Sequence, residues 1–88
     1  MHRVSTNING VDFTNKEQKL FNFLKDNINQ VCERESIIST VWPEEEELGV
    51  TDWAVDRLMA RVRGKLKKQN NPYEVVTVKT RGYKLIGA

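Results

Sequence analysis

The side chains best suited to chemistry in this sequence are the arginines and lysines of its last third. Residues 57–88 hold nine basic residues against one acidic residue, whereas residues 1–56 hold five basic residues against eleven acidic ones. A dense group of guanidinium and ammonium groups on a chain of nearly neutral net charge is typical of a polyanion-binding surface. A basic helix face that only keeps the protein in solution is the alternative, and charge alone does not separate the two.

The sequence does not contain the groups of residues that a catalytic or metal-binding site needs. The chain has one histidine, His2, and one cysteine, Cys32. A zinc site needs roughly three or four clustered ligands, and a nucleophilic cysteine needs an anchored base beside it. The five glycines are scattered singly, so no glycine-rich phosphate loop is present. The sequence therefore predicts a binding protein with no cofactor rather than an enzyme.

Length and composition indicate one domain over residues 1–88. A chain of 88 residues builds one small core, and its 39% hydrophobic content is enough for folding. No apolar run approaches the about 20 residues that span a bilayer, and the N-terminus has no apolar stretch of a secretion signal. A lone cysteine fits a reducing compartment. We therefore expect a cytoplasmic protein with no membrane partner.

The first half of the chain predicts a β-hairpin and two helices. Asn9-Gly10, between short alternating stretches, is typical of a type I′ hairpin turn. Thr14 and Glu17 form a capping box that opens a helix reaching about Asn27. Its apolar stripe, expected in the core, comprises Leu20, Phe21, Leu24 and Ile28. A second helix is expected over Arg34–Trp42, where Ile37, Ile38 and Val41 are apolar and Pro43 prevents continuation.

A third helix, expected over residues 52–68, combines an apolar stripe with a basic face. Its core positions are predicted to be Val55, Met59, Val62 and Leu66. Arg57, Arg61 and Lys65 recur at steps of four and should share a face, with Lys68 close by. Ala60 and Gly64 are small residues that would let a nucleic-acid groove approach closely, although a slight bend or plain tolerance of Gly64 explains it equally well.

The last element is expected to be a β-hairpin over about residues 74–86. Its two strands flank Lys79-Thr80-Arg81-Gly82, a turn with two cations at its tip. Two helices, a basic helix and a basic-tipped hairpin follow one another in the order of a winged helix-turn-helix, an α+β fold. In that fold the third helix enters the major groove of DNA and the hairpin, or wing, reaches the adjacent backbone or minor groove.

Several stretches of the chain resemble the DNA-binding effector domain of OmpR/PhoB-type bacterial response regulators, in order and spacing, over roughly residues 8–86. They are Phe13-Thr14-Asn15-Lys16-Glu17, Val31-Cys32-Glu33-Arg34-Glu35 followed by Val41-Trp42, Val55-Asp56, Arg61-Val62-Arg63-Gly64-Lys65-Leu66 and Thr77-Val78-Lys79-Thr80-Arg81-Gly82-Tyr83. The receiver domain that precedes this module in the family is absent, which suggests an excised effector domain or a regulator controlled in another way.

The resemblance implies sequence-specific binding to double-stranded promoter DNA, often as head-to-tail pairs, and therefore association with the nucleoid when bound. It assigns base reading to Arg61, a groove-facing position to Arg57, a backbone position to Arg63, and minor-groove entry to Lys79, with Arg81 close by. Thr77 and Tyr83 match phosphate contacts in the wing. With the basic face and turn, the candidate DNA contacts are Trp53, Ala54, Arg57, Leu58, Arg61, Arg63, Lys65, Lys68, Thr77, Lys79, Thr80, Arg81 and Tyr83.

Some positions depart from the family pattern. Trp53 stands where the family commonly has a polar or basic residue that contacts phosphate, and Leu58 stands where a histidine is frequent. Ala60 and Lys79 each stand where the family usually has an arginine. These differences bear on the target sequence more than on binding itself. The family's loop between the second and third helices meets RNA polymerase, so Glu44, Glu45, Glu46 and Glu47 are candidate polymerase contacts; a solvated acidic loop is the alternative.

Two further alternatives concern the third helix and the core. Trp53 has two possible roles, packing in the protein or a contact with a phosphate or sugar of DNA. Trp42, Met59 and Cys32 are expected in the core. The rival to DNA binding is a winged-helix module that docks a partner protein. It would require an exposed apolar face, to which Trp53 and Leu58 are the candidate contributors.

Overall fold

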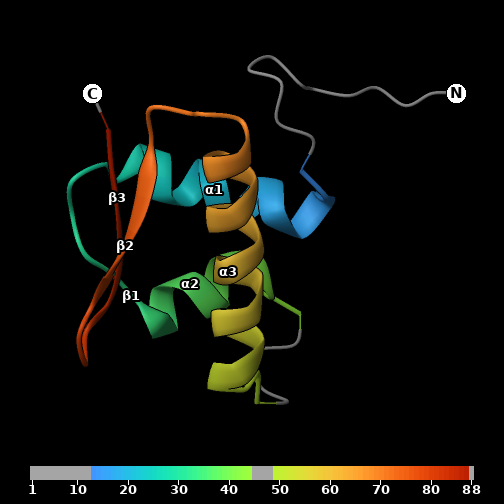
Figure 1. Cartoon of the computed structure of the whole chain (residues 1–88). Helices are drawn as coiled ribbons and strands as arrows, with labels where there is room; N and C mark the ends of the chain where they lie inside the picture. The colour runs from blue at the N-terminus through green and yellow to red at the C-terminus, as the bar shows by residue number, and fades with distance from the viewer. Residues whose placement is uncertain (1–12, 45–48, 88) are drawn as a thin grey trace, which may run out of the picture.

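The computed structural model describes residues 13–44 and 49–87, which form three helices and a three-stranded sheet (Figure 1). The elements follow in the order α1 (Asn15–Asp26), β1 (Cys32–Glu33), α2 (Arg34–Val41), α3 (Asp52–Lys68), β2 (Glu74–Val78) and β3 (Gly82–Ile86). The hairpin expected around Asn9-Gly10 lies outside the described residues.

Helix α1 begins with the predicted capping box, which is confirmed. The backbone N–H of Glu17 donates to Thr14 Oγ1 over 3.3 Å, and the backbone N–H of Thr14 donates to Glu17 Oε1 over 2.9 Å. Two N–H groups that the first helical turn leaves without a partner are thereby satisfied. The helix ends at Asp26, one residue before the predicted Asn27, which serves as C-cap.

Helix α2 follows directly on the two-residue strand β1. It buries Ile37 and Val41 completely and ends one residue before Trp42, since Pro43 cannot continue a helix. Strand β1 was not predicted, because two residues carry no periodic pattern. It exists because Cys32 and Glu33 pair with Tyr83 and Gly82 of β3.

Helix α3 has the predicted bounds, with Thr51 as N-cap accepting a hydrogen bond from the N–H of Ala54. The predicted stripe is confirmed: Val55, Met59, Val62 and Leu66 are all at most 1% exposed. Leu58 joins this stripe at 7% exposure. The buried face is wider than predicted because α3 packs against both other helices and against β2.

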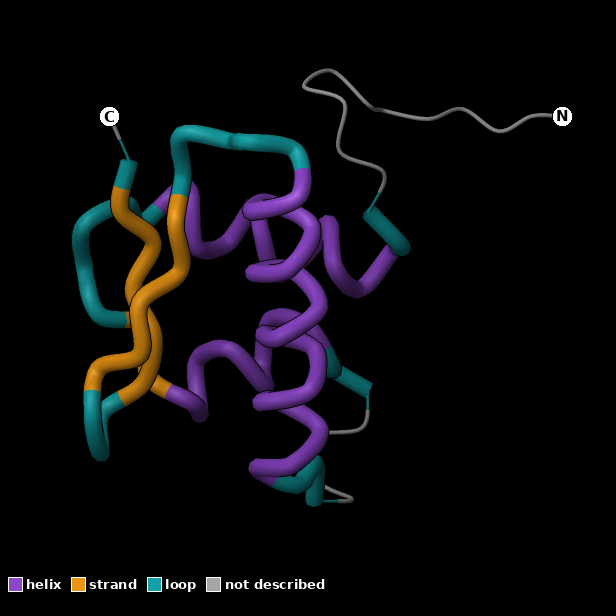
Figure 2. The backbone as a smooth tube through the Cα atoms, in the orientation of Figure 1, coloured by secondary structure: helices purple, strands orange, loops and turns teal. Residues whose placement is uncertain are grey.

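The sheet has the strand order β1-β3-β2, with β3 antiparallel to both neighbours. Figure 2 shows the three strands on one side of the molecule and the helices on the other. Gly82, at the start of β3, passes so close to β1 that a Cβ there would overlap the carbonyl oxygen of Cys32. Glycine is therefore required where the wing joins β1.

The core lies between the helices and the inner face of the sheet. The predictions that Trp42, Met59 and Cys32 are core residues are confirmed, with exposures of 8%, 1% and 4%. Burial raises the pKa of the Cys32 thiol, as expected for a cysteine that acts as a small apolar side chain. The arrangement is the predicted winged helix-turn-helix. Because one face of α3 is packed in the core, the opposite face lies at the surface of the domain.

Candidate nucleic-acid interface

The side of α3 opposite the core carries what we call the outward row. Its members recur at helical steps of three or four and are all exposed: Trp53, Arg57, Ala60, Arg61, Gly64 and Lys68. The row follows from the apolar stripe, because residues about half a helical turn away from Val55, Met59 and Val62 must face away from the core. It presents three long cations along one side of the helix.

No carboxylate of the described residues neutralises these three cations. Within residues 13–44 and 49–87, Arg57, Arg61 and Lys68 form no ion pair. Salt bridges on α3 involve its other sides, at Asp52, Asp56 and Lys65. The outward row therefore keeps its positive charge available to an external anion.

The first two turns of the outward row hold a cation–π pair. The Arg57 guanidinium carbon lies 5.0 Å from the centroid of the Trp53 ring, and Trp53 is 67% exposed. Of the two interpretations of Trp53, packing in the core is thus excluded, and a role at the surface remains.

The small residues of the row have open space before them. A Cβ added to Gly64 would meet no atom within 4 Å. Packing inside the described part of the domain therefore does not require a glycine here. Ala60 is also exposed, so the middle of the row is flat between the cations around it.

Lys65 lies beside Arg61 and Lys68 on α3, but its ammonium group turns to α1, a partner that the four-residue steps did not predict. Its ammonium group lies 2.6 Å from Glu17 Oε1 on α1, and the Glu17 side chain is 2% exposed. Burial by itself would raise the pKa of Glu17, but hydrogen bonds from Lys65 and Thr14 outweigh it and lower this pKa below its ordinary value of 4.5. Lys65 therefore stabilises the α1–α3 contact.

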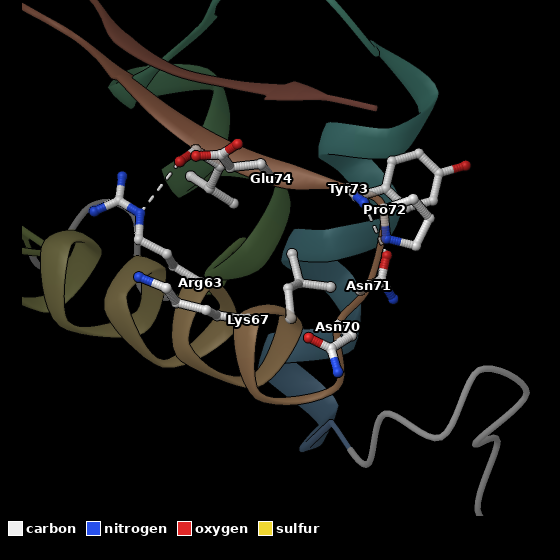
Figure 3. Close-up of a pocket in the computed structure, with 9 residues that line it drawn as sticks. Arg63, Lys67, Asn70, Asn71, Pro72, Tyr73 and Glu74 are labelled. Atoms are coloured by element: carbon white, nitrogen blue, oxygen red, sulfur yellow. Dashed lines mark hydrogen bonds between the residues drawn. The ribbon is translucent and has the colours of Figure 1, made fainter. Parts of the chain in front are cut away.

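Arg63 reaches from α3 to the wing (Figure 3). Its Nε donates to the carbonyl of Val75 over 3.2 Å and its terminal nitrogen donates to Thr77 Oγ1 over 2.9 Å. A groove of about 570 Å³ opens beside it, between the end of α3 and the start of β2. Arg63 and Thr77 thus fix the wing relative to α3, a use of these two residues that the sequence did not predict.

Tyr83 is also part of a structural node, and its assignment as a phosphate contact is corrected. The side chain is 5% exposed, and its hydroxyl donates to Asp56 Oδ1. The same carboxylate accepts from Arg34 over 3.0 Å, and the Arg34 guanidinium lies 5.4 Å from the Tyr83 ring centroid. The hydroxyl is therefore engaged by a carboxylate of the domain itself.

The Asp56 node joins α2, α3 and β3. Hydrogen bonds from Tyr83 and Arg34 lower the pKa of Asp56 below its ordinary value of 3.8. Burial and the bond to Asp56 raise the pKa of Tyr83. Sequence reasoning missed Arg34 and Asp56 as partners, since residues 22 positions apart carry no local signal of contact.

Leu58 is buried in the core, so its prediction as a DNA contact is wrong. Ala54 is half-buried, and its backbone N–H is already bound to Thr51. The rival protein-docking hypothesis loses Leu58, and Trp53 is the one large hydrophobic residue exposed among those described.

The tip of the wing carries Lys79, Thr80 and Arg81, all exposed. Figure 1 shows this turn at the same end of the molecule as the start of α3. The turn is closed by a hydrogen bond from the N–H of Arg81 to the carbonyl of Val78, and Thr80 adopts a φ of 62°. Arg81 lies 3.8 Å from Glu33, a pair exposed on both sides and therefore weak.

The remaining candidates concern the loop before α3 and other classes of site. Glu44 is exposed after α2, whereas Glu45, Glu46 and Glu47 lie outside the described residues. Among the described residues, no three His, Cys, Asp or Glu side chains gather to hold a metal ion. None of the helices described is both long and apolar enough to cross a membrane.

Comparison with known proteins supports this geometry. A family model described as "Transcriptional regulatory protein, C terminal" matches residues 8–85. The DNA-binding domain of the response regulator AdeR, solved with an intercistronic region, shares the fold with a TM-score of 0.76 and 22% identity over 89% of this chain and 79% of that one. No curated protein sequence gives a significant match.

Two further solved domains are similar. The RstA DNA-binding domain of Klebsiella pneumoniae, solved with the RstA box, has a TM-score of 0.65 and 23% identity over 86% of this chain and 74% of that one. The CpxR DNA-binding domain of E. coli has a TM-score of 0.67 and 26% identity over 89% of this chain and 76% of that one. With the family match over residues 8–85, these similarities show that the chain belongs to the OmpR/PhoB-type family of C-terminal domains of transcriptional regulatory proteins.

Proposed function

We propose that this domain regulates transcription by binding double-stranded DNA, with α3 in the major groove and the wing on the adjacent backbone or minor groove. The observation that carries the proposal is the outward row: Arg57, Arg61 and Lys68 are exposed and unpaired with carboxylates within the described residues. Two other cations of α3, Arg63 and Lys65, are bound inside the domain. Arginine and lysine side chains exposed along one helix suit phosphates and guanine edges.

The comparisons support the same function. Two of the similar domains were solved as complexes, AdeR with an intercistronic region and RstA with the RstA box. The wing tip adds Lys79, Thr80 and Arg81 at the end of the molecule where α3 begins. A helix and a hairpin that extend together from one end fit two neighbouring parts of a duplex. We assign base reading to Arg61 and minor-groove entry to Lys79.

Two assembly proposals accompany this function. We propose that domains bind direct repeats as head-to-tail pairs, and that the acidic segment from Glu44 to Glu47 offers a docking site for RNA polymerase. Both rest on the family, and the exposed Glu44 is the part of that segment that the structure describes. A binding titration on one and on two repeats gives the stoichiometry, and charge reversal at Glu44 with a transcription assay tests the docking site.

The DNA-binding proposal is tested by replacing cations of the outward row. We expect Arg61→Ala to weaken binding to the preferred DNA site of the domain by about 1–3 kcal/mol and to relax the base preference there. The free energy of unfolding should change by less than about 0.5 kcal/mol. Lys68→Ala should weaken binding to all sequences and reduce the slope of log K against log salt by about 1. Fluorescence anisotropy with duplexes at several salt concentrations measures both effects.

Lys84→Ala is the matched control for the loss of one charge. Tyr83 and Leu85 face the core, so Lys84 between them lies on the opposite side of the sheet from α3. We expect its replacement to leave the salt dependence unchanged. Equal losses for Lys84→Ala and Lys68→Ala would mean that net charge, rather than the outward row, determines affinity, and would contradict the proposal.

A further inference from the structure

We propose that Trp53 and Arg57 act as one reading unit, in which the Trp53 ring contacts the 5-methyl group of a thymine and Arg57 binds the neighbouring guanine. The inference rests on the proposed function and specifies which DNA feature this part of α3 recognises. It starts from a contact on the outward row, in the first two turns of α3. The guanidinium carbon of Arg57 lies 5.0 Å from the centroid of the Trp53 ring.

The first step concerns the place of the pair. Trp53 is the second residue of α3 and Arg57 lies one turn further. When a recognition helix enters the major groove, its N-terminal residues are those that contact base edges. Both side chains are exposed, and the helix caps and the core use neither of them. The pair is therefore positioned where bases, rather than phosphates alone, come within reach.

The second step concerns the chemistry of the exposed ring. Arg57 covers one face of the indole, and the side chain is still 67% exposed. The major-groove edges of the bases offer donors, acceptors and a single apolar group, the methyl of thymine. When an aromatic ring enters this groove, contact with that methyl group removes apolar surface of both partners from water, which favours binding. Thymine is thus the base that the open part of the Trp53 ring complements.

The third step concerns what holds Arg57 in place. The two nearest acidic positions on α3 are directed elsewhere, because Asp56 binds Arg34 and Tyr83, and Asp52 lies 3.8 Å from Arg34. Among the described residues, the recorded contact of Arg57 is the Trp53 ring. A guanidinium held over a ring by a cation–π contact still has N–H donors to offer, and these match the two acceptors of guanine.

The last step concerns spacing. The 5.0 Å between the guanidinium and the ring centroid is less than two base-pair steps of about 3.4 Å each. This spacing suits a methyl group and a guanine on neighbouring base pairs. Trp53 orients Arg57 and adds an apolar contact of its own, so the unit distinguishes a thymine–guanine step from the same step without the methyl group.

The experiment begins with selection of bound duplexes from a random pool with the 88-residue chain. In the selected site, each thymine is replaced in turn by deoxyuridine, which lacks the 5-methyl group, and each guanine by 7-deazaguanine, which lacks the N7 acceptor. At one thymine we expect deoxyuridine to weaken binding about three- to fivefold. At the adjacent guanine we expect 7-deazaguanine to weaken it about fivefold or more.

Protein variants assign these effects to the pair. In Trp53→Ala the cost of deoxyuridine at that thymine should disappear, whereas Trp53→Phe, which keeps a ring but has no N–H donor, should retain most of it. In Arg57→Lys the cost of 7-deazaguanine should fall, since an ammonium group cannot bind guanine with two parallel donors. Variants are compared at equal folded fractions, measured by circular dichroism.

Different results overturn the inference and the proposed function. If no sequence is selected and binding shows no salt dependence, the proposed function fails. If a site is selected but deoxyuridine costs the same in Trp53→Ala as in the unmodified chain at every thymine, the reading unit fails and DNA binding stands. The inference is also overturned if Trp53→Phe loses as much affinity as Trp53→Ala on all sequences, because the indole N–H would then be the contacting group.

Discussion

Helix α3 carries the same residue types on two sides and uses them differently. On the outward row, Arg57, Arg61 and Lys68 have no carboxylate partner in the described part of the chain. On its flanks, Arg63 binds the wing and Lys65 binds Glu17 of α1. The difference lies in direction around the helix rather than in composition. Charge in a sequence therefore becomes a binding surface only where the fold provides no internal partner for it.

The two sides also differ in their effect on stability. Flanking cations satisfy buried acceptors, so the fold depends on them. The exposed cations of the outward row have no such partner among the described residues, and their mutual repulsion slightly opposes folding. Substitutions on the flanks should reduce stability, and substitutions on the outward row should reduce DNA binding with little change in stability. The following predictions test this separation, beginning with the largest effect.

Loss of the Asp56 carboxylate should have the largest effect on stability. Asp56→Ala leaves the buried Tyr83 hydroxyl without its acceptor and removes the partner of Arg34. We expect a loss of about 2–3 kcal/mol in the free energy of unfolding, measured by urea denaturation. Asp52→Ala is the control, since that side chain is 77% exposed and 3.8 Å from Arg34, and should cost less than about 0.5 kcal/mol. Similar losses for both variants would contradict a specific node.

Glu17 should follow with a smaller and pH-dependent effect. Glu17→Ala removes half of the capping box and the acceptor of Lys65, and we expect a loss of about 1–2 kcal/mol at pH 7. Glu17→Gln should lose less, because glutamine can complete a capping box. The pKa of Glu17 is lowered on folding, so its charge stabilises fully above about 4.5, the ordinary value, and the stabilisation is lost as pH falls through the folded pKa.

Urea denaturation between pH 7 and pH 3 measures this difference. The gap in stability between the unmodified chain and Glu17→Gln should narrow as the pH falls. Asp56 titrates in an overlapping range, because its pKa is also lowered from an ordinary value of 3.8, but it contributes equally to both proteins and cancels in the comparison. A gap that stays constant with pH would show that the Glu17 charge is not what stabilises the α1–α3 contact.

Gly64 gives the smallest effect, and one of opposite sign. Gly64→Ala should stabilise the fold by up to about 1 kcal/mol, since alanine favours the helix and its Cβ meets no atom within 4 Å. If DNA approaches the outward row closely here, the same methyl group should weaken binding at the selected site. Thermal unfolding and anisotropy test the two effects separately. Higher stability with unchanged affinity would indicate that the glycine is merely tolerated.

Local patterns in the sequence predicted most of the fold. The capping box at Thr14 and the bounds of α3 follow from rules that operate over three or four residues, and both are confirmed. Strand β1 was not predictable, because its two residues form a strand only through pairing with β3. The N-terminal hairpin stays a prediction.

The candidate site was predicted less completely than the fold. Four-residue steps identified Arg57 and Arg61 as neighbours, but they could not show that Lys65 turns to Glu17, 48 positions earlier in the chain. Leu58 was placed outside the core because a narrow stripe was assumed, whereas packing on several sides of α3 widens it. The direction of the Tyr83 hydroxyl depends on Asp56, 27 positions away. Contacts between distant residues thus account for each correction.

The strand order has a consequence for how the domain forms on the ribosome. Strand β3 is the last described element to be synthesised, yet it lies in the middle of the sheet and supplies the partner strand for both β1 and β2. Until it emerges, neither edge strand has a neighbour, and Asp56 lacks the tyrosine that it binds. A nascent chain halted before Gly82 would therefore hold its three helices without a sheet to pack against. The fold of this domain is therefore completed only once β3 has emerged, rather than gradually.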